Sequence, residues 1–226
     1  MAQALGVGFF DRSGRRIDTP ITGASLHAID RIDIDTLSSR VAEADVIALC
    51  DVTNPLTGPN GAAHVYGPQK GANPADVAQL DAGLYRLAMI IRSDLGINID
   101  SIPGAGAAGG LGAGLVAFAG ASLRSGIDSV LTTLDFDRRL TGAALCLTGE
   151  GRIDGQSMSG KACMGITARA SRLGVPTVAL VGQATPDASN CLDAGLSEIV
   201  VIGEGLHPDE SRKHAARLLK TAAART

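Results

Sequence analysis

The feature that most constrains the fold is the alternation of short apolar runs with helix-forming segments over the second half of the chain. Buried strands are predicted for three apolar runs, at 143–147, 177–181 and 198–202. Helices are predicted for the segments that follow them, at 161–173, 188–194 and 208–224. Strands that alternate with helices form a parallel sheet with right-handed crossovers. The sequence therefore predicts an α/β fold.

The loop between the first of these strands and its helix carries the densest chemistry in the chain. In an open parallel sheet such a loop lies at the carboxyl edge, where ligands bind. The charged side chains expected to face a crevice there are Glu150, Arg152, Asp154 and Lys161. The glycines expected to let the backbone approach a bound anion are Gly149, Gly151 and Gly160.

Two other interpretations of this loop stay open. Gly155, Gly160 and Lys161 match the G-x-x-x-x-G-K part of a phosphate loop, but Ala162 stands where a Ser or Thr should hold magnesium. That mismatch disfavours a nucleotide hydrolase of the P-loop type. A solvated, glycine-rich turn with ordinary surface charges is the second alternative.

A second polar loop follows an apolar run at 45–52, which predicts another buried strand. Asp51 stands at the end of that run, as a metal ligand or hydroxyl partner would. Neutral donors and a cation for a carboxylate or phosphate are offered by Asn54, Gln69 and Lys70. A turn in which Asp51 and Asn54 bond to the local backbone is an equal alternative.

A glycine-rich stretch at 103–112 follows a helix predicted from Asn73 and Pro74 to Gly96. Its backbone amides could bind an anion at the start of a small-residue helix, at 115–123. The glycines assigned to that role are Gly104, Gly106, Gly109 and Gly110. Close packing of the backbone is an alternative, and so is a G-x-G-x-x-G dinucleotide motif with Asp128 on the ribose. The poor strand before the motif disfavours the dinucleotide site.

Composition excludes several classes of protein. A formal net charge of −3, no Trp and 3% aromatic residues argue against nucleic acid as a partner. The sequence contains neither an apolar run of about 18 residues nor a signal peptide, so we expect a cytoplasmic protein without a membrane partner. Four widely spaced cysteines predict buried free thiols.

Three stretches together resemble the type I glycerate kinase family: 50–56 with 67–71, then 103–110, then 148–154 with Gln156, Gly160 and Lys161. The resemblance implies ATP-dependent phosphorylation of D-glycerate in a cleft between two α/β domains. One domain would be a flavodoxin-like parallel sheet, and the other would be inserted into it. We accordingly expect 1–98 to be the later part of the inserted domain and 99–226 to be the closing half of the flavodoxin-like domain.

Members of that family are considerably longer, so we expect this chain to lack the family's N-terminal segment. A truncated, non-catalytic ligand-binding fragment is therefore the alternative function. Besides D-glycerate, a homo-oligomer or a complementing N-terminal fragment is left open as a partner.

The resemblance also suggests how the three loops share the work of phosphoryl transfer, with ATP and Mg²⁺ as cofactors. The uncharged 103–112 loop would cradle the nucleotide phosphates. The 148–161 loop would hold metal and the transferring phosphoryl group, and the 51–70 loop would bind glycerate. The expected cations are Lys70 and Lys161, the expected metal-binding carboxylates are Asp51, Glu150 and Asp154, and Arg152 would clamp the glycerate carboxylate.

Overall fold

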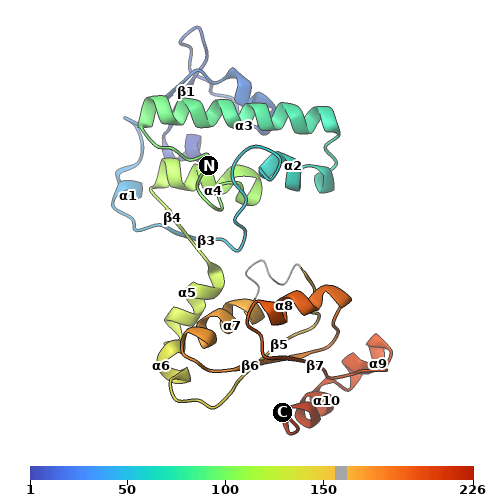
Figure 1. Ribbon diagram of the computed structural model, residues 1–226. Coiled ribbons are helices and arrows are strands. Elements are labelled where there is room, and N and C mark those ends of the chain that lie inside the picture. Colours follow the sequence, from blue (N-terminus) through green and yellow to red (C-terminus); the bar gives the residue numbers. More distant parts are fainter. Residues whose placement is uncertain (156–161) are drawn as a thin grey trace. The chain divides into compact units, whose positions relative to one another are not determined.

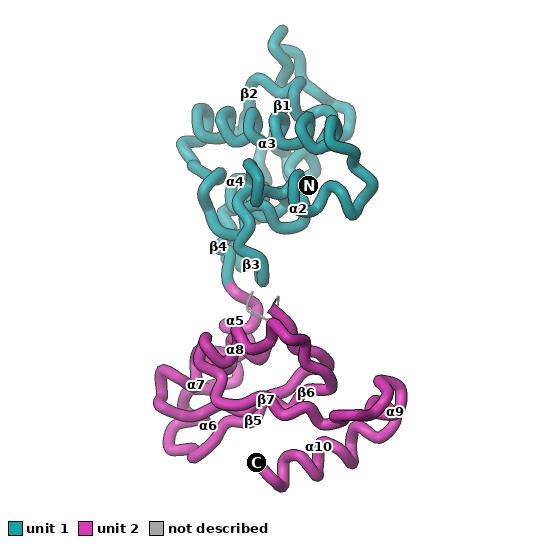
Figure 2. The backbone as a smooth tube through the Cα atoms, turned by 45° about the vertical axis from the view of Figure 1, so that its right-hand side comes forward, with its two compact units in different colours: residues 1–124 teal, residues 125–226 magenta. Residues whose placement is uncertain are grey.

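The computed structural model describes residues 1–155 and 162–226 (Figure 1). The chain divides into two compact units, 1–124 and 125–226, which we describe one at a time (Figure 2). The predicted domain boundary between 98 and 99 falls inside the first unit. The assignment of the two segments to an inserted and a flavodoxin-like domain stays a prediction.

The first unit is built around a long helix, α3 (Pro74–Leu95), as predicted. The Asn73 side chain caps it by accepting from the amides of Ala75 and Asp76, and Gly96 ends it in a left-handed conformation with φ of 71°. One face of α3 is buried against the 3₁₀ helix η2 (Gly23–Ala28) and the strand β2 (Arg31–Asp33). This face forms much of the unit's apolar core.

Shorter elements complete the first unit. β2 pairs antiparallel with β1 (Gly8–Phe10). The remaining helical segments of this unit are η1 (Ala2–Leu5), α1 (Ser39–Ala42), α2 (Ala62–Tyr66), η3 (Pro68–Lys70) and α4 (Ala107–Ala119). The helix predicted at 115–123 is wrong at both ends, because α4 begins earlier and a left-handed Gly120 stops it.

A parallel pair of strands, β3 (Ile47–Leu49) and β4 (Ser122–Arg124), also belongs to this unit. The strand predicted at 45–52 contains β3 but is longer than β3, and its predicted burial is wrong. Ile47 is 42% exposed and Leu49 is 58% exposed. An apolar run favours a strand, whereas burial also requires a covering layer, which the described residues do not provide here.

The second unit contains the predicted parallel sheet, in the order β5–β6–β7. Its strands are β5 (Cys146–Glu150), β6 (Thr177–Val181) and β7 (Glu198–Val201). Its helices are α5 (Gly126–Thr133), α6 (Phe136–Leu140), α7 (Ala162–Arg172), η5 (Pro186–Ala188), α8 (Ser189–Asp193), α9 (Pro208–Lys213) and α10 (Ala215–Ala223). The α/β prediction is confirmed, although the helix predicted at 208–224 is divided at His214.

Apolar clusters on both faces of β6 hold the second unit together. Ala179 and Val181 pack with Met164 of α7 and Cys191 of α8. Val178 and Leu180 pack with Ala222 of α10 on the other face. Since every residue of β6 is buried, this strand has the two covered faces of an internal parallel strand.

A polar tie joins the helices beside the sheet. The Arg169 guanidinium of α7 donates to the Asp128 carboxylate and the Thr132 hydroxyl of α5, and to the Asp137 carboxylate of α6. Asp128 is therefore engaged in a structural ion pair, at 3.2 Å from the Arg169 Nε. No strand precedes Gly104 within residues 97–103. The dinucleotide interpretation therefore lacks both the strand before the glycines and an available acidic residue for the ribose.

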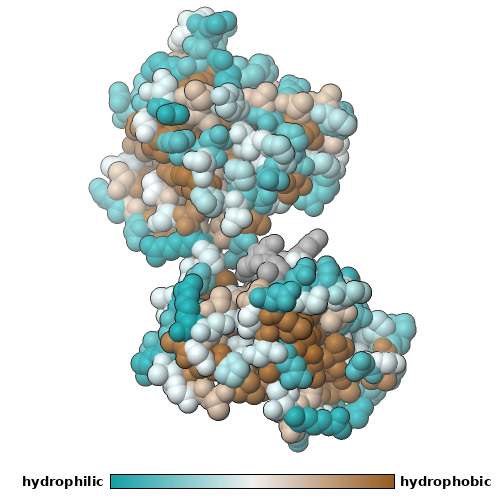
Figure 3. All heavy atoms as spheres, in the orientation of Figure 1, coloured by the Kyte–Doolittle hydropathy of each residue, from teal (hydrophilic) through white to brown (hydrophobic). Residues whose placement is uncertain are grey.

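The cysteines behave largely as predicted. All four lie in the described ranges and are free thiols; three are buried and Cys50 is partly exposed. Within residues 1–155 and 162–226, no helix has the length and apolar character needed to cross a membrane. Apolar side chains do reach the surface of both units (Figure 3).

Candidate functional site

The first candidate site lies at the carboxyl edge of the parallel sheet in the second unit. The predicted strand at 143–147 is shifted, because β5 continues to Glu150, which pairs in register with Val181. The chain beyond β5 remains attached to the segment beyond β6. The Ile153 amide donates to the Gln183 carbonyl at 2.9 Å, and the Thr185 amide donates to the Ile153 carbonyl at 3.1 Å.

This attachment makes 151–155 an ordered extension of the sheet rather than a solvated turn. Ile153 is 0% exposed and packs into the apolar cluster of α7 and α8. Its neighbours Arg152 and Asp154 keep their side chains partly accessible, with Arg152 61% exposed. The two groups approach each other to 4.0 Å, between the Arg152 Nε and an Asp154 carboxylate oxygen.

Among the residues of this edge, Glu150 gives the strongest indication of a bound ligand. Its Oε1 atom is buried and has no hydrogen-bond partner among the described residues. A buried carboxylate oxygen without a partner is costly, so a cation or donor is expected there. Burial raises the pKa of the nearby Cys163 thiol, and the Glu150 carboxylate raises that pKa further.

Asp187 adds a carboxylate that our sequence analysis missed. It accepts from the Thr185 hydroxyl and from the Gly155 amide, the latter at 3.0 Å, and these two bonds lower its pKa, with a small contribution from Arg152. The available signal was its position just beyond the strand at 177–181, at the start of a helical turn. Asp187 fixes the end of the 151–155 segment.

The glycines at this edge have different structural roles. A Cβ on Gly149 would lie 2.6 Å from the Leu180 carbonyl oxygen, so this glycine is required for strand packing. Around Gly151, by contrast, no described heavy atom lies within 4 Å of the position that a Cβ would take, which leaves its backbone approachable. Gly160 and Lys161, together with Gln156, lie outside the described residues.

The chemistry of this edge suits a metal shared with a ligand better than a metal held by protein alone. The described residues contain no group of three or more His, Cys, Asp or Glu side chains that could hold a metal. Magnesium, however, is commonly bound by one or two carboxylates together with substrate phosphates. The orphaned oxygen of Glu150 fits that mode.

The second candidate site, in the first unit, contains Asn54. The Asn54 side-chain amide donates to the Asn60 carbonyl at 2.8 Å, and its oxygen accepts from the Tyr66 hydroxyl at 2.7 Å. Burial raises the pKa of Tyr66. Asn54 therefore connects its loop to α2 through the Tyr66 hydroxyl. The turn considered from the sequence, in which the side chain bonds only to the local backbone, does not include this contact.

The glycine-rich 103–112 stretch packs against this loop. The Gly106 amide donates to the Asn54 carbonyl at 3.0 Å, and a Cβ on Gly106 would stand 2.2 Å from the Pro55 oxygen. Ala105, Ala107 and Gly110 also donate to backbone carbonyls. These contacts favour the close-packing alternative, and nucleotide binding by the glycines stays a prediction.

Three other predicted residues of the first unit are exposed. Asp51 follows β3, and Gln69 and Lys70 lie on η3. The structure brings Lys70 to the lining of one cavity with Gly109 and Gly110. In the second unit it brings Glu150, Arg152 and Asp154 to one sheet edge.

A parallel sheet flanked by helices, with charged side chains at its carboxyl edge, places the second unit among the α/β proteins that bind ligands at that edge. Comparison with known proteins narrows that class. The Glycerate kinase family matches residues 1–226, so the chain belongs to the glycerate kinase family. The resemblance stated from three sequence stretches is confirmed.

Individual relatives agree with this family assignment. The chain is 41% identical over 207 residues to Glycerate 2-kinase of Escherichia coli (strain K12), covering 90% of this chain and 54% of that protein. It is 40% identical to Glycerate kinase of Halalkalibacterium halodurans, covering 99% and 58%. A crystal structure named for glycerate kinase 2 of Salmonella typhimurium LT2 superposes with a TM-score of 0.70 at 41% identity, covering 88% and 51%.

The chain thus spans about half the length of the curated relatives it matches. The expectation that a family N-terminal segment is missing is not supported by the family match, which covers residues 1–226. We therefore assign the activity and the partners of the longer relatives to this chain only as proposals.

Proposed function

We propose that this chain acts in the phosphorylation of D-glycerate by ATP. Membership of the glycerate kinase family supports the reaction class, and the names of the relatives support the substrate. The observation that carries the proposal within the molecule is the orphaned Glu150 oxygen at the sheet edge. A phosphotransferase needs such a group to hold the cation that accompanies the nucleotide.

Glu150 and Asp154 are the residues of the second unit proposed to hold Mg²⁺, and Asp51 is the candidate in the first unit. When bound, the ion would offset the negative charge of the phosphates. Arg152 keeps an accessible guanidinium, which suits bidentate binding of the glycerate carboxylate. Lys161 remains a proposed cation for the phosphoryl group and lies outside the described residues.

In the first unit, Lys70 and Gln69 are proposed to bind glycerate because both are exposed and offer donors. Asn54 is proposed to act with them, held in place by Tyr66 and Asn60. Phosphate binding by the 103–112 stretch stays proposed for Gly104, Gly106, Gly109 and Gly110, and it is best supported at Gly109, where no described heavy atom lies within 4 Å of the position that a Cβ would take.

The decisive test is ADP release from ATP with and without D-glycerate, using the purified chain and the variants Glu150→Gln and Glu198→Gln. Glu198 is a matched control because it is exposed at the opposite, amino end of the same sheet. We expect Glu150→Gln to lower kcat by about 10²- to 10³-fold, as for other preorganised electrostatic groups. The control should retain the wild-type rate.

ADP release that does not depend on glycerate would refute the proposed function, and so would the absence of calorimetric binding of either ligand. Binding of both ligands without turnover would instead support the non-catalytic alternative. For the product, we propose 2-phosphoglycerate, because the Escherichia coli relative is named Glycerate 2-kinase. Phosphorus NMR of the product distinguishes the two positions. We also propose a cytoplasmic location, since buried free thiols suit a reducing compartment.

A further inference from the structure

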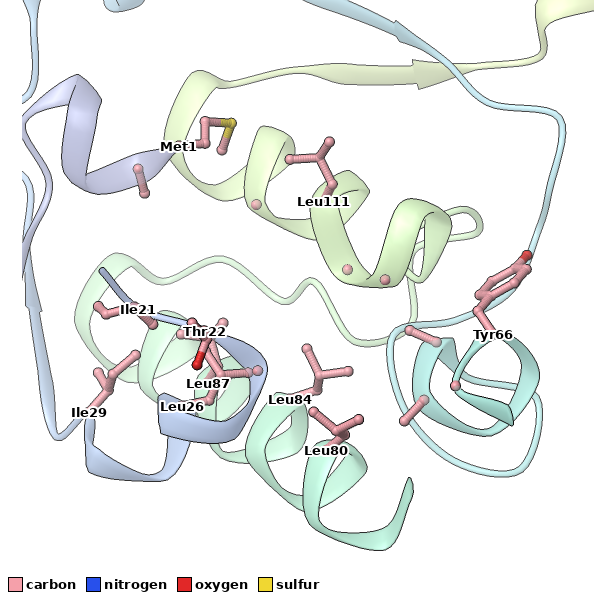
Figure 4. Close-up of a pocket in the computed structure, with 18 of the residues that line it drawn as sticks. Met1, Ile21, Thr22, Leu26, Ile29, Tyr66, Leu80, Leu84, Leu87 and Leu111 are labelled. Atoms are coloured by element: carbon pink, nitrogen blue, oxygen red, sulfur yellow. The ribbon is translucent and has the colours of Figure 1, made fainter. Parts of the chain in front are cut away.

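The first unit contains a cavity that shares Lys70, Gly109 and Gly110 with the proposed glycerate and phosphate sites, while the rest of its lining, which is mostly apolar, has no role above. Its volume is about 370 Å³, which falls within the usual range of small-molecule sites, about 300–1,000 Å³. Figure 4 shows the cavity between α4, which contributes Leu111, and the opposite wall of η2 and α3, with Leu26, Leu80, Leu84 and Leu87. Tyr66 of α2 closes one end.

The polar groups in the lining are already engaged with protein. The Gln3 amide donates to the carbonyls of Ile17 and Thr19, and its oxygen accepts from the Ile21 amide. The Tyr66 hydroxyl donates to Asn54. These side chains therefore cannot read the hydrogen-bonding edge of a nucleobase without giving up bonds they already make.

The lining also contains a charged side chain that could bind a ligand. Lys70 is the only charged side chain among the lining residues, all of which lie within the described 1–155 range. It is exposed, so its ammonium group can stay hydrated while its stem follows the apolar wall. The complementary ligand has an apolar body and a single negative charge.

We propose that this cavity binds a small amphiphilic carboxylate, with its hydrocarbon body between α3 and α4 and its carboxylate at Lys70. The apolar walls supply the affinity by removing hydrocarbon surface from water. Lys70 selects the charged ligand over its neutral analogue. Because Lys70 is also assigned to glycerate, octanoate binding is assayed in the absence of that substrate.

The probe is octanoate, titrated calorimetrically into the purified chain, with octanol as its neutral analogue. We expect saturable, one-site binding of octanoate. Lys70→Gln should weaken octanoate about fivefold, the scale of an exposed ion pair, and should leave octanol unchanged. This difference separates a charge contact from general damage to the cavity.

A second set of variants fills the cavity. Gly114 lines it, and a Cβ there would meet only the flexible end of Met1, at 3.4 Å. Gly114→Leu should therefore abolish binding of both probes, and Leu111→Trp, at a partly exposed lining position, provides a second filling variant. Ala78→Leu, on the exposed side of α3, is the matched control and should bind as the wild type does.

Two results would overturn the proposal. One is octanoate binding that is equal in the wild type and in a folded cavity-filling variant, with folding checked by circular dichroism. The other is displacement of a cavity-bound apolar fluorophore by adenosine but not by octanoate, which would show that the site takes a nucleobase.

Discussion

Truncation of Ile153 tests whether a buried anchor holds the charged sheet edge in place. Ile153→Ala removes three carbon atoms from a side chain that is fully buried beside Val181 and Cys191. At about 0.8 kcal/mol for each buried CH₂ group, the lost transfer free energy is about 2.4 kcal/mol. The residual cavity adds to this, so we expect a loss of about 3 kcal/mol in the free energy of unfolding, within the range known for such changes.

Urea unfolding at 25 °C measures the effect, with Leu192→Ala as the control. Leu192 lies on α8 in the same unit and is exposed, so its truncation should change the free energy of unfolding by less than about 0.5 kcal/mol. Ile153→Val should fall between the two, at about 1 kcal/mol. Equal losses for Ile153→Ala and Leu192→Ala would refute the anchoring role.

Two further predictions concern charge and backbone. The folded-state pKa of Asp187 is lowered from 3.8, so its contribution to stability is present above that pH and is lost as the pH falls through the folded pKa. The stability difference between the wild type and Asp187→Asn should therefore be larger at pH 7 than at pH 3, by urea titration; an unchanged difference would contradict the linkage. Gly106→Ala should destabilise more than Gly109→Ala, because a Cβ would strike the Pro55 oxygen at the first position. At the second, only the left-handed φ of 73° opposes it, at about 1–2 kcal/mol. Thermal unfolding of both variants gives the order.

Local sequence signals were sufficient for several elements. Asn73, Pro74 and Gly96 encode the start and end of α3 through capping, which acts over a few residues. The apolar runs located β6 and β7, and β6 gave the clearer signal because a parallel strand covered on both faces is almost entirely apolar. The order of strands and helices then predicted the class of fold.

Tertiary contacts determined what the sequence pattern did not show. β5 includes Gly149 and Glu150, which no apolar criterion selects, because pairing with β6 holds them in register. The role of Gly106 depends on Pro55, a residue far away along the chain. The exposure of Leu49 depends on whether another layer covers it. The lowered pKa of Asp187 depends on hydrogen bonds from Thr185 and Gly155.

The alternation at 152–154 has a consequence for how such a protein can diversify. The inward-facing Ile153 secures the segment, while the accessible Arg152 and Asp154 present its chemistry. Under the proposed function, mutations at the two accessible positions would change which ligand is selected while Ile153 keeps the interior packed. The sheet edge thereby separates mutational tolerance from structural constraint, so new specificities can be explored there one residue at a time.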